Sequence, residues 1–162
     1  MRRNLGDTID LCRAIVSHLV TRDTVIVADP FLRSGGRRCF CLVDCRPSLG
    51  KLLYSYRDRD FIIEFASSID FGQVCSLGFA AEIEVTLYHG SVRKTYFWSA
   101  ELVDQGVCQR ASILDSTEQV ADAEPDGCSV RPAGQWIIDP NGVVVRVGLV
   151  HALRCVAQTV AT

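Results

Sequence analysis

At 162 residues, the chain is long enough to bury one hydrophobic core and too short for two domains of ordinary size. Its composition, 48% hydrophobic and 22% charged, is typical of a globular protein and excludes a fibrous or disordered chain. A net charge of −2 gives no overall positive field, so strong nonspecific binding to nucleic acid or to an anionic membrane is not expected.

The sequence predicts a protein of the cytoplasm or the nucleus, with no membrane partner. Asp7 and Asp10 interrupt the stretch that would have to be apolar in a signal peptide, and no apolar run approaches the roughly 20 residues of a membrane helix. The eight cysteines, including the cluster Cys39, Cys41 and Cys45, contain no C-x-x-C pair. We interpret them as small apolar side chains in a reduced interior, and a disulfide framework or a structural metal is the less favoured alternative.

The N-terminal half is predicted to contain one helix followed by short strands. Apolar residues at three- and four-residue steps indicate a helix over residues 7–21. Residues 24–32 and 37–45 are predicted to pair as a hairpin, with Pro30 at an edge or a bulge. Residues 51–56 and 61–67 are predicted to form a second hairpin, and a helical turn over residues 51–56 is the alternative.

A further hairpin is predicted over residues 81–103, because two alternating runs flank a turn. A type II′ loop of Gly90 and Ser91 would pair Val85 with Tyr96. In that register the apolar face consists of Ile83, Val85, Leu87, Tyr96 and Trp98. The opposite, polar face consists of Glu82, Glu84, Thr86, Arg93, Thr95, Ser99 and Glu101.

The C-terminal part begins with a polar stretch, residues 104–127, that is predicted to be a surface loop with one helical turn. Residues 136–147 are predicted to form a hairpin, because Asn-Gly stands between two apolar runs. Beyond Gly148, a helical spacing favours a closing helix, and continuation of the strand to Val150 is the alternative.

These elements predict a single globular domain over residues 1–162 of the α+β class. The N-terminal helix is expected to pack on a mainly antiparallel β-sheet or a two-layer β assembly, with a C-terminal helix closing the fold. The chain contains no G-x-S-x-G, P-loop, dinucleotide-binding or H-E-x-x-H motif. We therefore expect no catalytic residue, no bound metal and no cofactor, and no resemblance to a known family is specific enough to name.

The polar face of the 81–103 hairpin carries aromatic residues among charges, which is typical of a protein-binding surface. The predicted interaction surface consists of Glu82, Glu84, Tyr88, Arg93 and Phe97. We interpret the chain as a non-enzymatic intracellular interaction or regulatory module, such as a viral accessory protein. Its partner would be an unidentified protein or a second copy of the chain in a homodimer.

Two alternatives from other functional classes stay open. Arginines at the predicted turns could contact a phosphate backbone, although nucleic acid is the less favoured partner because the chain has no basic field. These arginines are Arg33, Arg37, Arg38, Arg57 and Arg59. The other alternative is a small enzyme that uses a cysteine, or the pair Glu82 and Glu84 as acid and base.

Overall fold

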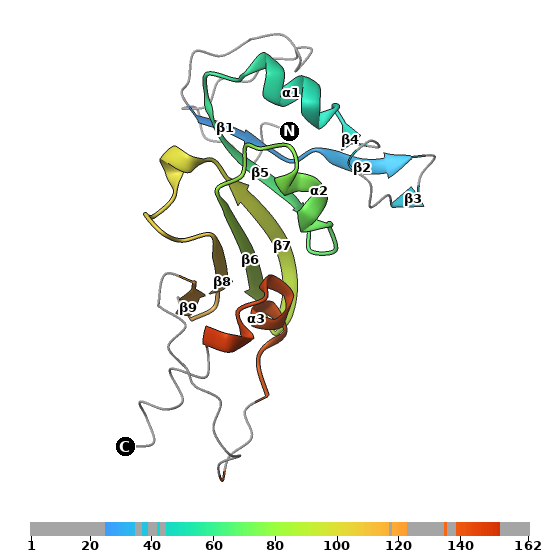
Figure 1. Cartoon of the computed structure of the whole chain (residues 1–162). Coiled ribbons are helices and arrows are strands. Elements are labelled where there is room, and N and C mark those ends of the chain that lie inside the picture. The colour runs from blue at the N-terminus through green and yellow to red at the C-terminus, as the bar shows by residue number, and fades with distance from the viewer. Residues whose placement is uncertain are drawn as a thin grey trace, which may run out of the picture.

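The computed structural model describes residues 25–34, 37–38, 42, 45–116, 118–122, 135 and 139–152. Its main feature is a six-stranded sheet with the strand order β1-β5-β7-β6-β8-β9 (Figure 1). These strands are β1 (Val25–Ala28), β5 (Asp60–Ala66), β6 (Glu82–Tyr88), β7 (Ser91–Trp98), β8 (Gln109–Ile113) and β9 (Glu118–Ala121). The pairs β1–β5 and β6–β8 are parallel, and the other three pairs are antiparallel. The fold is therefore mixed α/β.

A second, three-stranded sheet and short helices complete the described structure. The small sheet has the order β3-β2-β4, with β2 (Phe31–Ser34), β3 (Arg37–Arg38) and β4 (Cys45–Arg46). The helices are α1 (Leu49–Ser55), α2 (Phe71–Cys75), the 3₁₀ helix η3 (Ala100–Leu102) and α3 (Gly142–Val147). The predicted helix over residues 7–21 lies outside the described residues, as does most of the predicted C-terminal helix.

The first predicted hairpin is only partly correct. The β2 and β3 strands pair antiparallel on either side of Gly35 and Gly36, as expected. The β1 strand instead pairs in parallel with β5 in the other sheet. Pro30, which is buried between β1 and β2, has no N–H to donate and separates the two strands. The second predicted hairpin is wrong, because residues 49–55 form α1 and bury Leu49 and Leu52 in the core.

The β6–β7 hairpin forms, but the predicted register is wrong. The turn is His89-Gly90, and both residues have positive φ angles, 48° and 69°, as a type I′ turn requires. The turn alone would pair Val85 with Lys94, but a register shift between Thr86 and Leu87 leaves one extra residue in β7, so Val85 pairs with Thr95 instead of Tyr96. Because this extra residue reverses the faces of β7 relative to the prediction, Phe97 points into the core and Tyr96 points to the opposite, outer face.

The polar stretch at residues 104–127 contains two strands where a surface loop was predicted. Asp122 accepts hydrogen bonds from the backbone N–H groups of Cys108 and Gln109, at 2.8 and 3.0 Å. Ala111 of β8 is buried in the core, whereas its neighbours Arg110 and Ser112 bond to side chains on the outer face. The strand therefore alternates between the two faces even though most of its residues are polar.

The predicted Asn-Gly hairpin is wrong as well, because a helix begins at this point. The side chain of Asn141 accepts a hydrogen bond from the N–H of Val143 and caps α3. The helix buries Val143, Val144 and Val147. It ends at Gly148, whose φ of 93° is the left-handed conformation typical of a helix C-terminus.

The core lies on one face of the six-stranded sheet, where the helices cover it. Side chains from the central strands, such as Phe65, Val85 and Phe97, join the buried residues of α1, α2 and α3 in one cluster. Arg146 links α3 to the segment after β5, because its guanidinium donates hydrogen bonds to the carbonyl oxygens of Ser67 and Ile69. The outer face is left with the polar and aromatic side chains of the same strands.

Three cysteines can be assessed, and they agree only in part with the interpretation of cysteines as core residues. Cys45 is buried, whereas Cys75 and Cys108 are exposed. Within the described ranges, no group of three histidine, cysteine or acidic side chains could hold a metal ion. No helix in this part of the chain is both long enough and apolar enough to cross a membrane.

Candidate functional site

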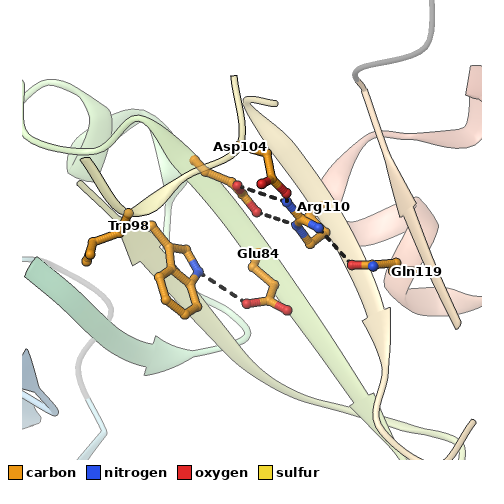
Figure 2. A pocket seen from close by; sticks show the side chains of 7 residues that line it. Glu84, Trp98, Asp104, Arg110 and Gln119 are labelled. Atoms are coloured by element: carbon orange, nitrogen blue, oxygen red, sulfur yellow. Dashed lines mark hydrogen bonds and ion pairs between the residues drawn. The ribbon is translucent and has the colours of Figure 1, made fainter. Parts of the chain in front are cut away.

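A cavity of about 240 Å³ opens on the outer face of the sheet (Figure 2). Its lining residues come from the strands β6, β7, β8 and β9 and from η3 with the loop that follows it. The lining residues are Glu82, Glu84, Trp98, Leu102, Asp104, Arg110 and Gln119. The cavity therefore depends on the pairing of β6 with both β7 and β8, which the predicted surface loop would not have allowed.

One wall of the cavity is organised by Arg110. Its guanidinium donates to Glu82 at 2.6 Å, to Asp104 at 2.8 Å and to Gln119 at 2.7 Å. Glu82 is only 3% exposed, so this ion pair is largely removed from water. The hydrogen bonds from Arg110 to Glu82 and then to Asp104 raise the pKa of Arg110 further above its ordinary value. The guanidinium of Arg110 therefore links three side chains of this wall through its hydrogen bonds.

The opposite wall is formed by Glu84 and Trp98. The indole Nε1–H of Trp98 donates to Glu84 Oε2 at 3.1 Å (Figure 2). The hydroxyl of Ser112 donates to Glu84 Oε1 at 2.6 Å. Both donors are neutral, and no Lys, Arg or His nitrogen of the described chain lies within 4.0 Å of this carboxylate. Glu84 is thus fixed in position, and no ion pair with another described residue neutralises its charge.

Tyr96 extends the site along the outer face. It stands between Glu64 and Glu84 in the strand register, and its ring centroid is 6.4 Å from that of Trp98. Partial burial, followed by the charge and hydrogen bond of Glu64 and the charge of Glu84, raises the pKa of Tyr96 to about 12. The phenol is therefore neutral at physiological pH, and its proton is held in a region of negative potential.

The predicted interaction surface is not one surface. Glu82 and Glu84 do come together, but in the cavity wall, where Glu82 is nearly inaccessible. Tyr88 and Arg93 lie near the turn of the hairpin, where the guanidinium of Arg93 stacks over the Tyr88 ring at 5.9 Å. Phe97 is 0% exposed, so its assignment to the surface is wrong and follows from the register error.

The arginines considered for nucleic-acid contact come from two separate parts of the fold. Arg33 lies in β2, and Arg37 and Arg38 form β3, but the structure does not describe their side chains. Arg57, in the turn after α1, is exposed and stacks over Tyr54 at 5.4 Å. Nucleic-acid binding by these residues stays a prediction.

Trp98, Arg110, Asp104 and Gln119 were not recognised as site residues. The correct register of β7 would have placed Trp98 opposite Glu82, on the same sheet face as Glu84. Arg110 and Gln119 were not predicted as site residues because their strands lie in the polar stretch that was predicted to be a loop. The sequence signal that could have found them is the alternation in Gln109–Ile113, where a small apolar residue stands between two polar ones.

No family model matches the chain, but curated proteins and a solved structure are similar to it. Over 147 residues, 91% of this chain, it is 58% identical to uncharacterized S-adenosylmethionine-dependent methyltransferases from two strains of Mycobacterium tuberculosis. The chain is similar to methyltransferases. The match spans 41% of the length of each of these relatives.

The solved structure is a Porphyromonas gingivalis protein assigned as a methyltransferase. It aligns with 84% of this chain and 36% of its own, with a TM-score of 0.58 and 18% identity, which shows a similar fold. The relatives overturn the interpretation of the chain as a non-enzymatic interaction or regulatory module, and as a viral accessory protein, because they are named as enzymes and are bacterial. The expectation that the chain is not an enzyme is wrong for the same reason.

Proposed function

We propose that the chain works as part of an S-adenosylmethionine-dependent methyltransferase, with the outer face of its sheet directed to the methyl acceptor. The observation that carries this proposal is the 58% identity to the mycobacterial relatives over 91% of the chain. The similar fold of the Porphyromonas gingivalis protein supports it. Because the chain spans 41% of the relatives' length, the proposal assigns the complete reaction to the whole protein.

The described residues do not fit S-adenosylmethionine as a whole. The cavity of about 240 Å³ is smaller than the roughly 300–1,000 Å³ of typical small-molecule sites. Two of its three carboxylates, Glu82 and Asp104, are already bonded to Arg110 and cannot turn to the hydroxyl groups of a ribose without breaking that cluster. The cofactor site is therefore to be sought among residues that the structure does not describe, or in the part of the relatives beyond the match.

A chimera tests this proposal directly. The 147 matched residues of the Mycobacterium tuberculosis relative would be replaced by the corresponding residues of this chain. The chimera would be incubated with methyl-tritiated S-adenosylmethionine and a mycobacterial extract as the source of acceptor. We expect tritium in the acceptor, with S-adenosylhomocysteine released, at a rate within about tenfold of that of the unaltered relative, which corresponds to about 1.4 kcal/mol in the activation barrier.

The unaltered relative is the positive control, and circular dichroism checks that the chimera is folded. A folded chimera that releases no S-adenosylhomocysteine while the relative does would contradict the proposal for this chain. A relative that shows no transfer to any fraction of the extract would remove the basis of the proposal altogether.

Two expectations from the sequence accompany this proposal. The helix predicted over residues 7–21 would pack on the sheet, and the protein would work in the cytoplasm or nucleus, where its thiols stay reduced. The support for the second comes from the sequence, whose eight cysteines contain no C-x-x-C pair.

A further inference from the structure

We propose that the cavity between Glu84 and Trp98 binds an organic cation, such as the ammonium or guanidinium group of a side chain or a small amine. Cation binding follows from the geometry of this chain alone. The identification of that cation as the methyl acceptor rests in addition on the proposed function.

The charge of the lining selects a cation. Three carboxylates face one guanidinium, which leaves a net charge of −2 on the cavity wall. Arg110 bonds to Glu82 and Asp104 and therefore does not neutralise Glu84. An anionic ligand would meet the unpaired carboxylate of Glu84, whereas a cation would supply the counter-ion that the described residues lack.

The position of Glu84 is set before any ligand arrives. Its two oxygens are held by the indole N–H of Trp98 and the hydroxyl of Ser112, which come from the strands on either side of β6. Because these donors are neutral, they orient the carboxylate without cancelling its charge. A ligand cation would thus find a rigid acceptor, with little side-chain entropy left to lose on binding.

The aromatic rings favour an organic cation over a metal ion. Trp98 borders the cavity, and its indole is fixed by the bond to Glu84 (Figure 2). Tyr96, with its neutral phenol, lies beside Trp98 outside the cavity lining, at 6.4 Å between ring centroids. The faces of aromatic rings attract ammonium and guanidinium groups through their quadrupoles. A metal ion would instead need several free oxygen ligands, but Glu82 and Asp104 are held by Arg110, and the described residues contain no group of three metal ligands.

Fluorescence of Trp98 provides the test. The chain has two tryptophans, so a Trp136→Phe background leaves Trp98 as the reporter. This protein would be titrated with butylammonium, with butylguanidinium, and with butanol and butyrate as the neutral and anionic analogues. We expect saturable changes with dissociation constants in the millimolar range for the two cations and none for butanol or butyrate.

Glu84→Gln should weaken cation binding by about tenfold or more, because the amide can still accept the Trp98 or Ser112 bond but carries no charge. Glu118→Gln is the matched control, since Glu118 also accepts a bond from a serine hydroxyl and precedes Gln119, so its side chain points to the other face of β9. Binding of butylammonium should be the same in Glu118→Gln as in the parent.

Equal binding of butylammonium and butanol, or equal affinity of the parent and Glu84→Gln, would overturn the proposal. If Glu84→Gln does not fold, the indole N–H resonance of Trp98 in the unaltered chain decides the question. It should move with butylammonium and stay in place with butanol. None of these measurements uses S-adenosylmethionine, so the two proposals can fail separately. An inactive chimera together with intact cation binding would contradict the proposed function alone. An active chimera together with absent cation binding would contradict the cation site alone.

Discussion

Replacing Phe97 by alanine is expected to lower the free energy of unfolding by about 3–5 kcal/mol, as is typical for truncation of a large buried aromatic side chain. Phe97 is 0% exposed and lies in the centre of the sheet, on β7. Its ring meets Phe65 and Phe71 edge to face, with centroids at 5.6 and 6.0 Å. Urea unfolding followed by circular dichroism measures the loss.

Tyr88→Ala is the matched control, because Tyr88 belongs to the neighbouring strand β6 but is 43% exposed. Its loss should lower the free energy of unfolding by no more than about 1 kcal/mol. If Phe97→Ala lowered the free energy of unfolding as little as Tyr88→Ala does, Phe97 would have to lie at the surface. That result would contradict the observed register of the hairpin.

Replacing Arg110 by methionine is expected to destabilise the protein by about 3–5 kcal/mol, because Glu82 would remain as an unpaired charge in a largely buried position. Glu82 is 3% exposed and forms an ion pair with Arg110. Urea unfolding followed by circular dichroism measures the loss of stability.

The double variant Arg110→Met with Glu82→Gln separates the loss of charge pairing from the loss of packing. With neither charge present, the double variant should recover much of the stability that Arg110→Met loses. A double variant that is as unstable as the single variant would show that Arg110 matters for its packing and not as the partner of Glu82.

Several elements could be predicted from the sequence, but their partners could not. The strands β5, β6 and β7 have the apolar alternation of half-buried strands. The ends of β5 and β6 were predicted within a residue or two, whereas the run predicted to reach Val103 ends at Trp98 in β7. The register of β6 and β7 was missed because both Gly90-Ser91 and His89-Gly90 satisfy the rules of a two-residue turn. The alternating pattern also did not indicate the register shift between Thr86 and Leu87, which turns Phe97 instead of Trp98 toward the core.

The C-terminal errors have a common physical cause, which is that local signals were overridden by tertiary contacts. Asn-Gly favours a hairpin, yet Asn141 is equally suited to cap a helix, and burial of Val143, Val144 and Val147 decides for the helix. In the same way, β8 is polar but gains its backbone hydrogen bonds from β6 and β9.

The candidate site was predicted only through its carboxylates. Glu82 and Glu84 share a strand face, and this spacing was recognised as a pair. Their different environments depend on Arg110 for Glu82 and on Trp98 and Ser112 for Glu84, which come from strands that the sequence did not place beside them. The similarity to methyltransferases was not predicted, because the sequence contains none of the dinucleotide-binding or catalytic motifs that were considered, and the chain spans 41% of the length of these relatives.

The central claim, that Glu84 receives the methyl acceptor of a methyltransferase, is tested most directly by the kinetics of the chimera. Methyl transfer would be measured for the parent chimera and for its Glu84→Gln and Glu118→Gln variants, with the acceptor purified from the extract. We expect Glu84→Gln to raise the KM for the acceptor by about tenfold or more, with the KM for S-adenosylmethionine unchanged and Glu118→Gln equal to the parent. An unchanged KM for the acceptor in Glu84→Gln, or an equal rise in both KM values, would contradict this account.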